Sequence, residues 1–242
     1  GLVRTLAEPN LTAMSGDTAH ANNTSYVLAQ GLYAVAVTAQ SAGNANVAND
    51  GLAIAMGDAH AEALLAISNG GSATLDNTSV AYAHAYGDAV AMHAIAAGNA
   101  TATNTGMAYA YSYSGTASGI VASGDNAYAL NDVGGVAQVT GVYAIGMDVQ
   151  GASSALGRND GIIDAWAIYD ATGMNVVASA GNADLTQNGD ITAYSYAGVA
   201  TGGIAQSTGG DANAHNAGTI KVDGQEATIN NPAVVERFTK VG

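Results

Sequence analysis

The chain has 242 residues, of which 48% are hydrophobic, so it is long enough to bury a core. It carries 19 acidic and 5 basic side chains, and the formal net charge of -14 argues against binding nucleic acid or an anionic membrane through basic patches. Cysteine is absent, which excludes disulfides and thiolate metal sites. With one Trp, one Phe and 32 Gly, the apolar fraction is mostly Ala, Val and Ile, which predicts thin, closely packed layers.

Residues 1–15 are predicted to be an N-terminal segment that precedes a set of repeats. The start at Gly1 fits a processed, secreted protein and fits a trimmed chain equally well. The longest uncharged apolar stretch, from about Tyr26 to Val37, alternates with period two and is interrupted at Gln30 and Gly31. It therefore predicts strand structure, and no membrane span is expected.

From residue 16 to residue 222 the sequence repeats. An Asn at a turn recurs with spacings of 26, 28, 27, 27, 28, 29 and 28 residues. A Gly followed by Asp or Asn precedes most of these marks, and a looser turn lies in the middle of each unit, so each unit reads as three strands and three turns. The Asn marks are Asn23, Asn49, Asn77, Asn104, Asn131, Asn159, Asn188 and Asn216.

The segments between the turns alternate strictly, as in residues 80–86 and 107–113. A period of two indicates strands, and here the pattern outweighs the helix propensity of Ala. A unit of about 27 residues cannot bury its own face, whereas stacked units can pair every strand with its counterpart. The predicted fold is therefore all-β, a parallel β-solenoid of about eight coils with a repeat of about 27 residues.

An alternative coil of 13 or 14 residues would double the length of the rod, but the uneven spacing of glycines within the unit disfavours it. Residues 223–242 break the repeat. They are predicted to form either a C-terminal cap, with Pro232 and nearby charges blocking the sheet edge, or a strand donated to a neighbouring subunit.

The repeat predicts stacked side chains. Tyr82 should stack on Tyr109, His84 on Tyr111 and Tyr86 on Tyr113, and Asn77, Asn104 and Asn131 should lie over one another. In the second strand of the unit, the cost of burying Glu62 places the alternating Ala face inside. For the first strand, either the Ala face or the face with Tyr, Ile and Met can be interior, and an outer aromatic stripe would mark a contact surface.

No catalytic motif is present, so we expect no enzymatic activity and no cofactor. The five histidines, His20, His60, His84, His93 and His215, are scattered without a zinc-binding phrase. The Gly-Asp turns could bind calcium, as in some parallel β-rolls, but the nonapeptide motif of those proteins is missing. The preference of Gly, Asp and Asn for turns is the favoured explanation of these residues. Sequons for N-glycosylation lie at Asn10, Asn22, Asn23, Asn77 and Asn99.

The phrases at residues 77–83 and 87–91 resemble the head repeats of trimeric autotransporter adhesins. The low charge and the richness in Ala, Gly, Asn and Tyr are similar to those of self-assembling extracellular fibre subunits, such as the amyloid-like sheath proteins of filamentous archaea. This resemblance implies a protein that works outside the cell or at its surface and assembles with copies of itself.

The leading hypothesis is therefore a structural subunit of a secreted, self-polymerising filament, tube or sheath, whose partner is the same chain. The alternative is a cell-surface adhesin or carbohydrate-binding β-solenoid. An ice-binding solenoid lacks a regular Thr array here, and a polysaccharide lyase would need a cluster of charged residues on one face.

Overall fold

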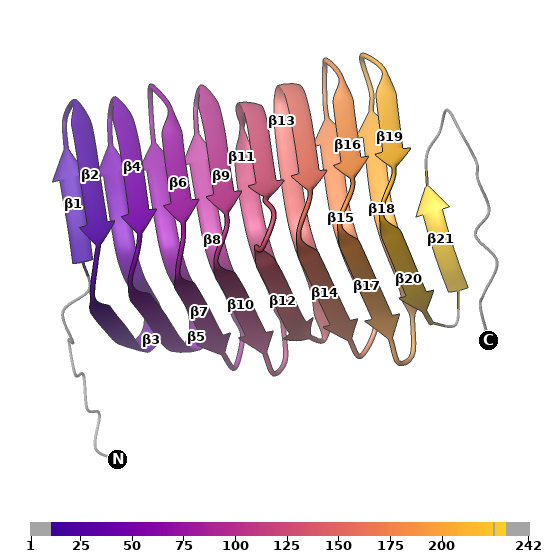
Figure 1. The fold of residues 1–242 in the computed structure, drawn as a ribbon. Coiled ribbons are helices and arrows are strands. Elements are labelled where there is room, and N and C mark those ends of the chain that lie inside the picture. Colours follow the sequence, from indigo (N-terminus) through magenta and orange to yellow (C-terminus); the bar gives the residue numbers. More distant parts are fainter. Residues whose placement is uncertain (1–10, 225, 231–242) are drawn as a thin grey trace.

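A computed structural model describes residues 11–224 and 226–230 of the chain. Every regular element in this part is a β-strand, and each pair of neighbouring strands runs parallel. The chain winds into coils that stack along one axis, so that each strand lies beside its counterparts from the adjacent coils (Figure 1). Among the described residues, no helix has the length and apolar character needed to cross a membrane.

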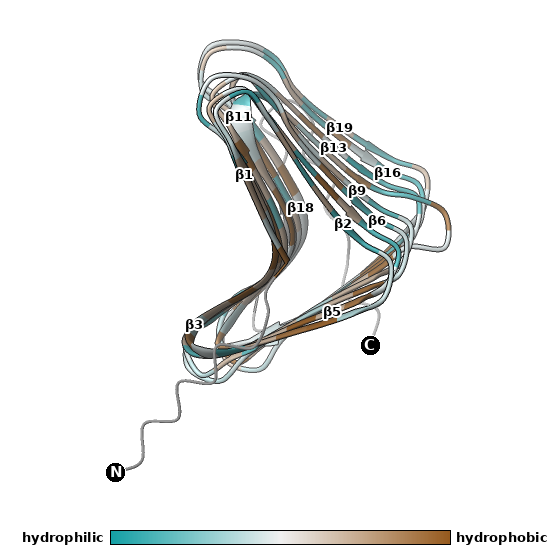
Figure 2. Ribbon diagram, turned by 90° about the vertical axis from the view of Figure 1, so that its left-hand side faces the viewer, coloured by the Kyte–Doolittle hydropathy of each residue, from teal (hydrophilic) through white to brown (hydrophobic). Residues whose placement is uncertain are grey.

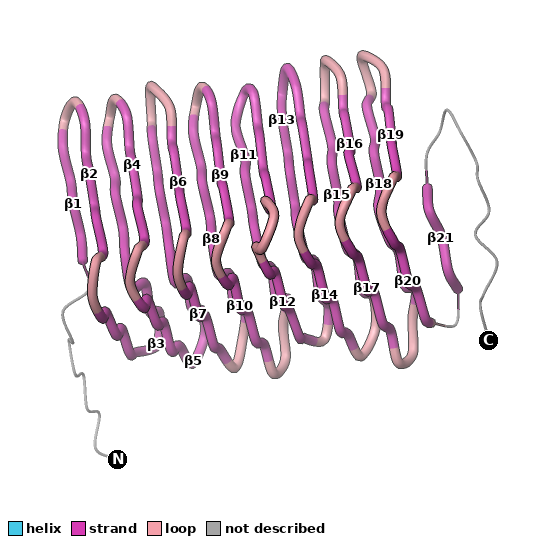
Figure 3. Tube along the Cα trace, in the orientation of Figure 1, coloured by secondary structure: helices cyan, strands magenta, loops and turns pink. Residues whose placement is uncertain are grey.

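Each coil has three sides, and each side stacks into one sheet (Figure 2). Four long strands turn a corner and so belong to two sheets each (Figure 3). These are β3 (Tyr26–Ser41), β5 (Leu52–Ser68), β11 (Thr116–Asn131) and β13 (Tyr143–Asn159). Sheet 1 contains the first parts of β3 and β5, β7 (Val80–Ala85), β10 (Met107–Ser112), β12 (Val136–Gly141), β14 (Ile162–Ala167), β17 (Asp190–Ser195) and β20 (Thr219–Asp223).

The other two sheets complete the coil. Sheet 2 contains β1 (Leu11–Ser15), the second parts of β3 and β5, β8 (Asp88–Ala96), the first parts of β11 and β13, β15 (Ala171–Ala178), β18 (Val199–Ser207) and β21 (Glu226–Asn230). Sheet 3 contains β2 (Thr18–Asn23), β4 (Asn44–Asn49), β6 (Ala73–Asn77), β9 (Asn99–Asn104), the second parts of β11 and β13, β16 (Ala183–Gln187) and β19 (Ala212–Asn216).

The register between coils confirms the predicted solenoid. Paired residues are separated by 26 positions where Tyr26 meets Leu52 and by 29 where Asp190 meets Thr219. The chain therefore makes about eight turns with a repeat of about 28 residues. The alternative coil of 13 or 14 residues is wrong, because no described strand pairs at that separation.

Strand pairing extends beyond residues 16–222 at both ends. β1 pairs with β3 from Leu11 onward, and β21 pairs with β18 as far as Asn230. The remaining parts of the two predicted terminal segments, residues 1–10 and 231–242, lie outside the described residues, as does Asn10 with its sequon.

The Ala face of every sheet is interior. In sheet 1, Ala81, Ala83 and Ala108 are completely buried, while Tyr82 and Tyr109 between them are partly exposed. This settles the orientation of the first strand of the unit: its Tyr, Ile and Met face points outward. Side chains as small as Ala are needed because three sheets of short strands enclose a narrow interior, which must be packed without voids.

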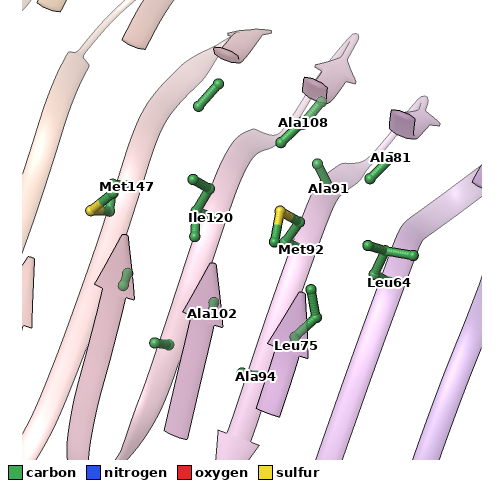
Figure 4. Close-up of a cluster of buried hydrophobic side chains, with 14 of the residues drawn as sticks. Leu64, Leu75, Ala81, Ala91, Met92, Ala94, Ala102, Ala108, Ile120 and Met147 are labelled. Atoms are coloured by element: carbon green, nitrogen blue, oxygen red, sulfur yellow. The ribbon is translucent and has the colours of Figure 1, made fainter. Parts of the chain in front are cut away.

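Larger side chains fill the centre at a bend in sheet 2. Figure 2 shows this sheet turning inward halfway along each coil. At the bend two successive residues face the interior, as Ala91 and Met92 do, and neither has exposed surface. Figure 4 shows these larger side chains gathered in the core, with Leu64, Leu75, Met92, Ile120 and Met147 labelled.

Along the rod, one inward position of sheet 2 becomes smaller while an inward position of sheet 1 becomes larger. In the C-terminal coils, Gly146, Gly173 and Gly202 occupy the inner position of the bend, and Ile163, Ile191 and Ile220 occupy the inner position of sheet 1 that is Ala in earlier coils. A Cβ on Gly202 would overlap Cγ2 of Ile220, and no other residue lies among its three nearest atoms. Large residues on one sheet are therefore matched by glycine on the other.

The glycine of the Asn-x-Gly turn is required by close backbone approach between coils. A Cβ on Gly106 would overlap the carbonyl oxygen of Ser79 in the preceding coil. Gly134 is the single described residue with positive φ, at 86°, and it lies in the longer turn before β12. These turns set the entry into sheet 1 and so position the Asn residues beside them.

Candidate functional site

The most regular feature of the molecule is a buried row of side-chain amides at the corner between sheets 3 and 1. We call this row the amide ladder. Each member except the last donates from its side-chain nitrogen to the side-chain oxygen of the member in the next coil, over 2.7–2.8 Å. Its members are Asn23, Asn49, Asn77, Asn104, Asn131, Asn159 and Gln187, and each is at most 3% exposed.

Backbone carbonyls hold the ladder amides in one orientation. The Asn104 Nδ2 also donates to the carbonyl oxygen of Gly106 at 3.1 Å, and Asn77 Nδ2 does the same to Ser79 at 3.2 Å. In both cases the backbone carbonyl two residues after the Asn accepts a hydrogen bond from that Asn side chain. Each such bond contributes about 0.5–1.5 kcal/mol net, whereas a buried amide left unpaired costs about 1–3 kcal/mol.

The ladder has a direction. Nitrogen donors point toward the C-terminal coils and oxygen acceptors toward the N-terminal coils, from Asn23 to Gln187. At the first coil, the Asn23 Oδ1 accepts from the backbone N–H of Ser25. In the last described coil, Asn216 pairs with Gln187 in the strand register, is exposed, and accepts at Oδ1 from the Gly218 N–H.

The seventh Asn mark predicted from the sequence, Asn188, lies one residue beyond the ladder position. Gln187, not Asn188, pairs with Asn159 and continues the ladder. Asn188 is exposed and donates to Asp160 at 2.7 Å. Gln187 can replace Asn in the ladder because its side chain ends in the same amide group. The Asn that follows it, Asn188, fits the sequence pattern almost as well, so the pattern did not reveal that Gln187 is the ladder residue.

The aromatic residues singled out from the sequence lie on the outer face of sheet 1. Tyr82 pairs with Tyr109 in the register, with ring centroids 6.4 Å apart. His84 and Tyr111 pair likewise, with centroids 5.2 Å apart and an edge-to-face angle of 65°. The role of these side chains in assembly stays a prediction.

Tyr86 and Tyr113 lie at the corner after sheet 1, where their rings stack at 6.3 Å and 23°. They are 66% and 57% exposed. Beside them an open groove of about 500 Å³ is lined by Gln30, Met56, Asp58 and His84, among others. Exposed, nearly parallel rings next to polar side chains form a surface that can pack against another flat molecule.

A second aromatic group, not singled out from the sequence as stacking, lies further along the rod, on sheet 1 and at its corner with sheet 2. Trp166 and Tyr194 have centroids 5.1 Å apart, and Tyr143 and Tyr169 have centroids 5.8 Å apart. Counting from the Asn marks misses the Trp166 pair by one residue, because Tyr194 lies as far after Gln187 as Trp166 lies after Asn159, whereas the mark used in the sequence was Asn188.

A cluster of ionisable side chains lies on the concave outer side of sheet 2. Glu62 Oε1 contacts His93 Nδ1 at 2.8 Å and His60 Nε2 at 3.3 Å, and Glu62 is only 7% exposed. Burial acts to raise the pKa of Glu62, but the hydrogen bonds from the two histidines outweigh it and lower that pKa to about 2. The bond to Glu62 raises the pKa of His60.

Glu62 therefore points outward, as the alternation predicted, yet is buried by the bend, which the sequence did not reveal. Three coils further on, burial raises the pKa of Asp148, although Asn175 and Gln150 donate hydrogen bonds to its carboxylate. Among the described residues, no group of three or more His, Cys, Asp or Glu side chains is arranged to hold a metal ion.

The predicted sequon residues fall into two environments. Asn22 and Asn99 are exposed. Asn23 and Asn77 are buried in the amide ladder, and their Nδ2 atoms are donors within it. A glycan on either of these two would require the ladder to open, so of the sequon residues that the structure describes, Asn22 and Asn99 have the geometry of an acceptor.

No protein-family model, no curated protein and no solved structure matches the chain.

Proposed function

We propose that the protein is a structural subunit that polymerises through its β-sheets into an extracellular filament, tube or sheath. One observation carries this proposal: within the described residues, the outermost strands of every sheet have one unpaired edge. At one end of the described rod, β1, β2 and the first part of β3 each pair on one side only, and at the other end β19, β20 and β21 do the same within the described chain. Open parallel edges template pairing with another chain.

The composition of the surface supports the same role. Few charges interrupt the sheets, since only 10% of residues are charged, and aromatic rings run along the outer face of sheet 1. The described grooves are shallow and open. The proposed role is mechanical and involves no turnover of a substrate.

Electron microscopy and fibre diffraction of the purified full chain test this proposal. We expect ordered polymers with a reflection near 4.7–4.8 Å along the polymer axis, because the stacked strands would continue from one subunit to the next. Protein that stays monomeric at high concentration, at several pH values and salt concentrations, would contradict it.

A carbohydrate-binding role is the second candidate, and the groove beside Tyr86 and Tyr113 is the observation that favours it. Sugar rings pack against exposed aromatic faces while nearby polar groups, here Gln30 and Asp58, bond their hydroxyls. Binding to a glycan array that is lost in Tyr113→Ala, but kept in a Tyr33→Ala variant at an exposed site elsewhere, would support this candidate.

A further inference from the structure

We infer that copies of this chain stack end to end in one defined register, with Asn216 of one copy directly over Asn23 of the next. This inference rests on the proposed polymerising function and specifies the contact that builds the polymer. The partner is a second copy of the chain, and the surfaces are the outer edges of the first and last described coils (Figure 1).

The two ends fit without a missing or an extra strand. Following the chain, the last three described strands belong to sheets 3, 1 and 2 in turn, and the first three belong to sheets 2, 3 and 1. Stacking one copy on the next therefore places β19 over β2, β20 over the first part of β3, and β21 over β1. Every sheet continues across the junction.

The register follows from the pairing between coils, in which each residue lies over its counterpart in the next coil and so forms a column along the rod. Ala19 and Asn23 begin columns that run through every coil of sheet 3 and end at Ala212 and Asn216. Both terminal strands read Ala-x-Ala-x-Asn, so the same inward residues meet at the junction. Shifting the register by one residue would turn these alanines outward.

The core also continues across the junction. Six apolar residues pack on the core while remaining partly exposed, and all of them are inward residues of the end coils: Leu11, Ala13 and Val27 at one end, and Ala214, Ile220 and Val222 at the other. In the inferred register Ile220 covers Val27 of the next copy, and Val222 covers its Ala29. Burying these groups removes apolar surface from water, which favours association.

The direction of the amide ladder selects head-to-tail stacking. Asn216 accepts at Oδ1 from the Gly218 N–H just as Asn23 accepts from the Ser25 N–H, and a side chain in the orientation of Asn23 directs its Nδ2 onward along the ladder while its Oδ1 faces the opposite end. Head-to-tail stacking brings donor to acceptor. Stacking two identical ends would bring donor to donor or acceptor to acceptor and would make the strands antiparallel.

The charges at the junction are compatible with this register. In sheet 3, His20 of the next copy lies under Asn213, and in sheet 1 its Leu28 lies under Lys221 and its Gln30 under Asp223. No two like charges are set directly over each other in these two sheets, a placement that would destabilise cross-strand pairs.

Engineered cysteines test the register, since the chain contains no Cys. The double variant His20→Cys with Asn213→Cys places the two thiols in one column of exposed residues. Across the inferred junction their Cα atoms would be about 4.8 Å apart, within the range that a disulfide spans. Within one chain they are separated by roughly 34 Å, the length of seven coil steps, so only two different copies can be joined.

Two matched pairs control this experiment. His20→Cys with His215→Cys moves one thiol two residues along the same strand, which puts the Cα atoms roughly 8 Å apart, too far for a disulfide. Asn46→Cys with Thr74→Cys is an in-register pair within one chain and shows that this geometry oxidises.

We expect mild oxidation of polymers to give a ladder of disulfide-linked multimers on a non-reducing gel for the 20/213 pair, and at least several-fold fewer for the 20/215 pair. Polymers without 20/213 crosslinks, while the 46/74 pair oxidises, would overturn the inferred junction and leave polymerisation standing. Equal crosslinking of both test pairs would overturn the register. Absence of polymers from the unmodified chain would overturn the proposed function as well.

Discussion

The Nδ2 of Asn77 donates to the Oδ1 of Asn104 over 2.8 Å. The two residues lie in adjacent coils and are 27 positions apart in the sequence. Both side chains are buried, and the bond is repeated by every neighbouring member of the amide ladder. The ladder therefore ties each coil to the next at the corner where sheet 3 ends and sheet 1 begins. Because a buried amide must be paired, it also fixes the register of successive coils.

Replacing one amide in the middle of the ladder should destabilise the fold. Asn104→Ala leaves the Oδ1 of Asn131 without its donor and removes one of the acceptors of Asn77 Nδ2, which keeps the Ser79 carbonyl. An unpaired buried group costs about 1–3 kcal/mol and a lost hydrogen bond about 0.5–1.5 kcal/mol, so we expect the free energy of unfolding to fall by at least about 1.5 kcal/mol. Urea denaturation followed by far-UV circular dichroism measures this change.

Asn99→Ala is the matched control, because Asn99 begins the same strand but is exposed. We expect its effect on the free energy of unfolding to stay within about 0.5 kcal/mol. Equal destabilisation by the two variants would show that the ladder has no special role in stability.

The exchange of side-chain size between sheets predicts a strong coupling between Gly202 and Ile220. Gly202→Ala alone places a methyl group against Ile220 and should cost about 1–3 kcal/mol through overpacking. Adding Ile220→Ala removes the obstructing side chain and restores the Ala pair that earlier coils use. In a double-mutant cycle of unfolding free energies, the double variant should therefore lose less than the sum of the single variants, and strict additivity would refute the packing argument.

Much of the fold was predictable from the sequence because the repeat is local and regular. Alternation of Ala with larger residues identified the strands, and the interval between Asn marks gave the register that places Tyr82 beside Tyr109. These features depend on neighbouring residues and on a constant spacing, both of which can be read directly. The orientation of sheet 1 could not be read in this way, because both of its faces are largely apolar.

The candidate site was less predictable because it depends on how the coil closes. The Asn marks were explained by turn chemistry and expected to lie over one another, but neither argument shows that their side-chain amides are buried and bonded to each other. The inward bend of sheet 2 arises from two consecutive inward residues, such as Ala91 and Met92, which break the alternation only slightly. Without that bend, Glu62 would be an ordinary exposed carboxylate.

The Glu62 cluster predicts that the stability of the fold decreases both at low pH and at high pH. The pKa of Glu62 is lowered from 4.5 to about 2, so its contribution is present above pH 4.5 and lost as the pH falls toward 2. The pKa of His60 is raised from 6.5, so its contribution is present below pH 6.5 and lost as the pH rises through the raised value. The cluster should therefore stabilise the fold most between about pH 4.5 and pH 6.5.

Glu62→Gln tests this dependence. We expect the loss in unfolding free energy to be greatest near pH 5.5, up to about 3 kcal/mol, and smaller at about pH 3 and pH 8. The control is Asp76→Asn, which changes an exposed carboxylate in β6. A loss in Glu62→Gln that is the same at all three pH values would mean that packing, and not charge, accounts for it.

Asp148 should behave in the opposite sense. Burial raises its pKa, so the folded state favours the protonated carboxyl group, and stability falls as the pH rises from 3.8 through the raised value. Asp148→Asn keeps an acceptor for Asn175 and removes the buried charge. We expect this variant to be more stable than the unmodified chain at pH 7 and equal to it near pH 3, as measured by thermal unfolding. A variant less stable at pH 7 would show that the carboxylate is well paired.

The net charge of -14 predicts that polymerisation depends on salt. Copies that stack end to end bring like net charges together, while the contacts of the junction act only at short range. Raising the ionic strength from about 0.01 M to 0.15 M shortens the screening length from about 30 Å to about 8 Å, so repulsion between approaching copies weakens. Light scattering at fixed protein concentration should therefore show polymer growth that is several-fold faster at the higher salt concentration. The same ionic strength set with two different monovalent salts controls for specific ion effects, and growth that slows with salt would mean that complementary charges, and not apolar and amide contacts, drive the association.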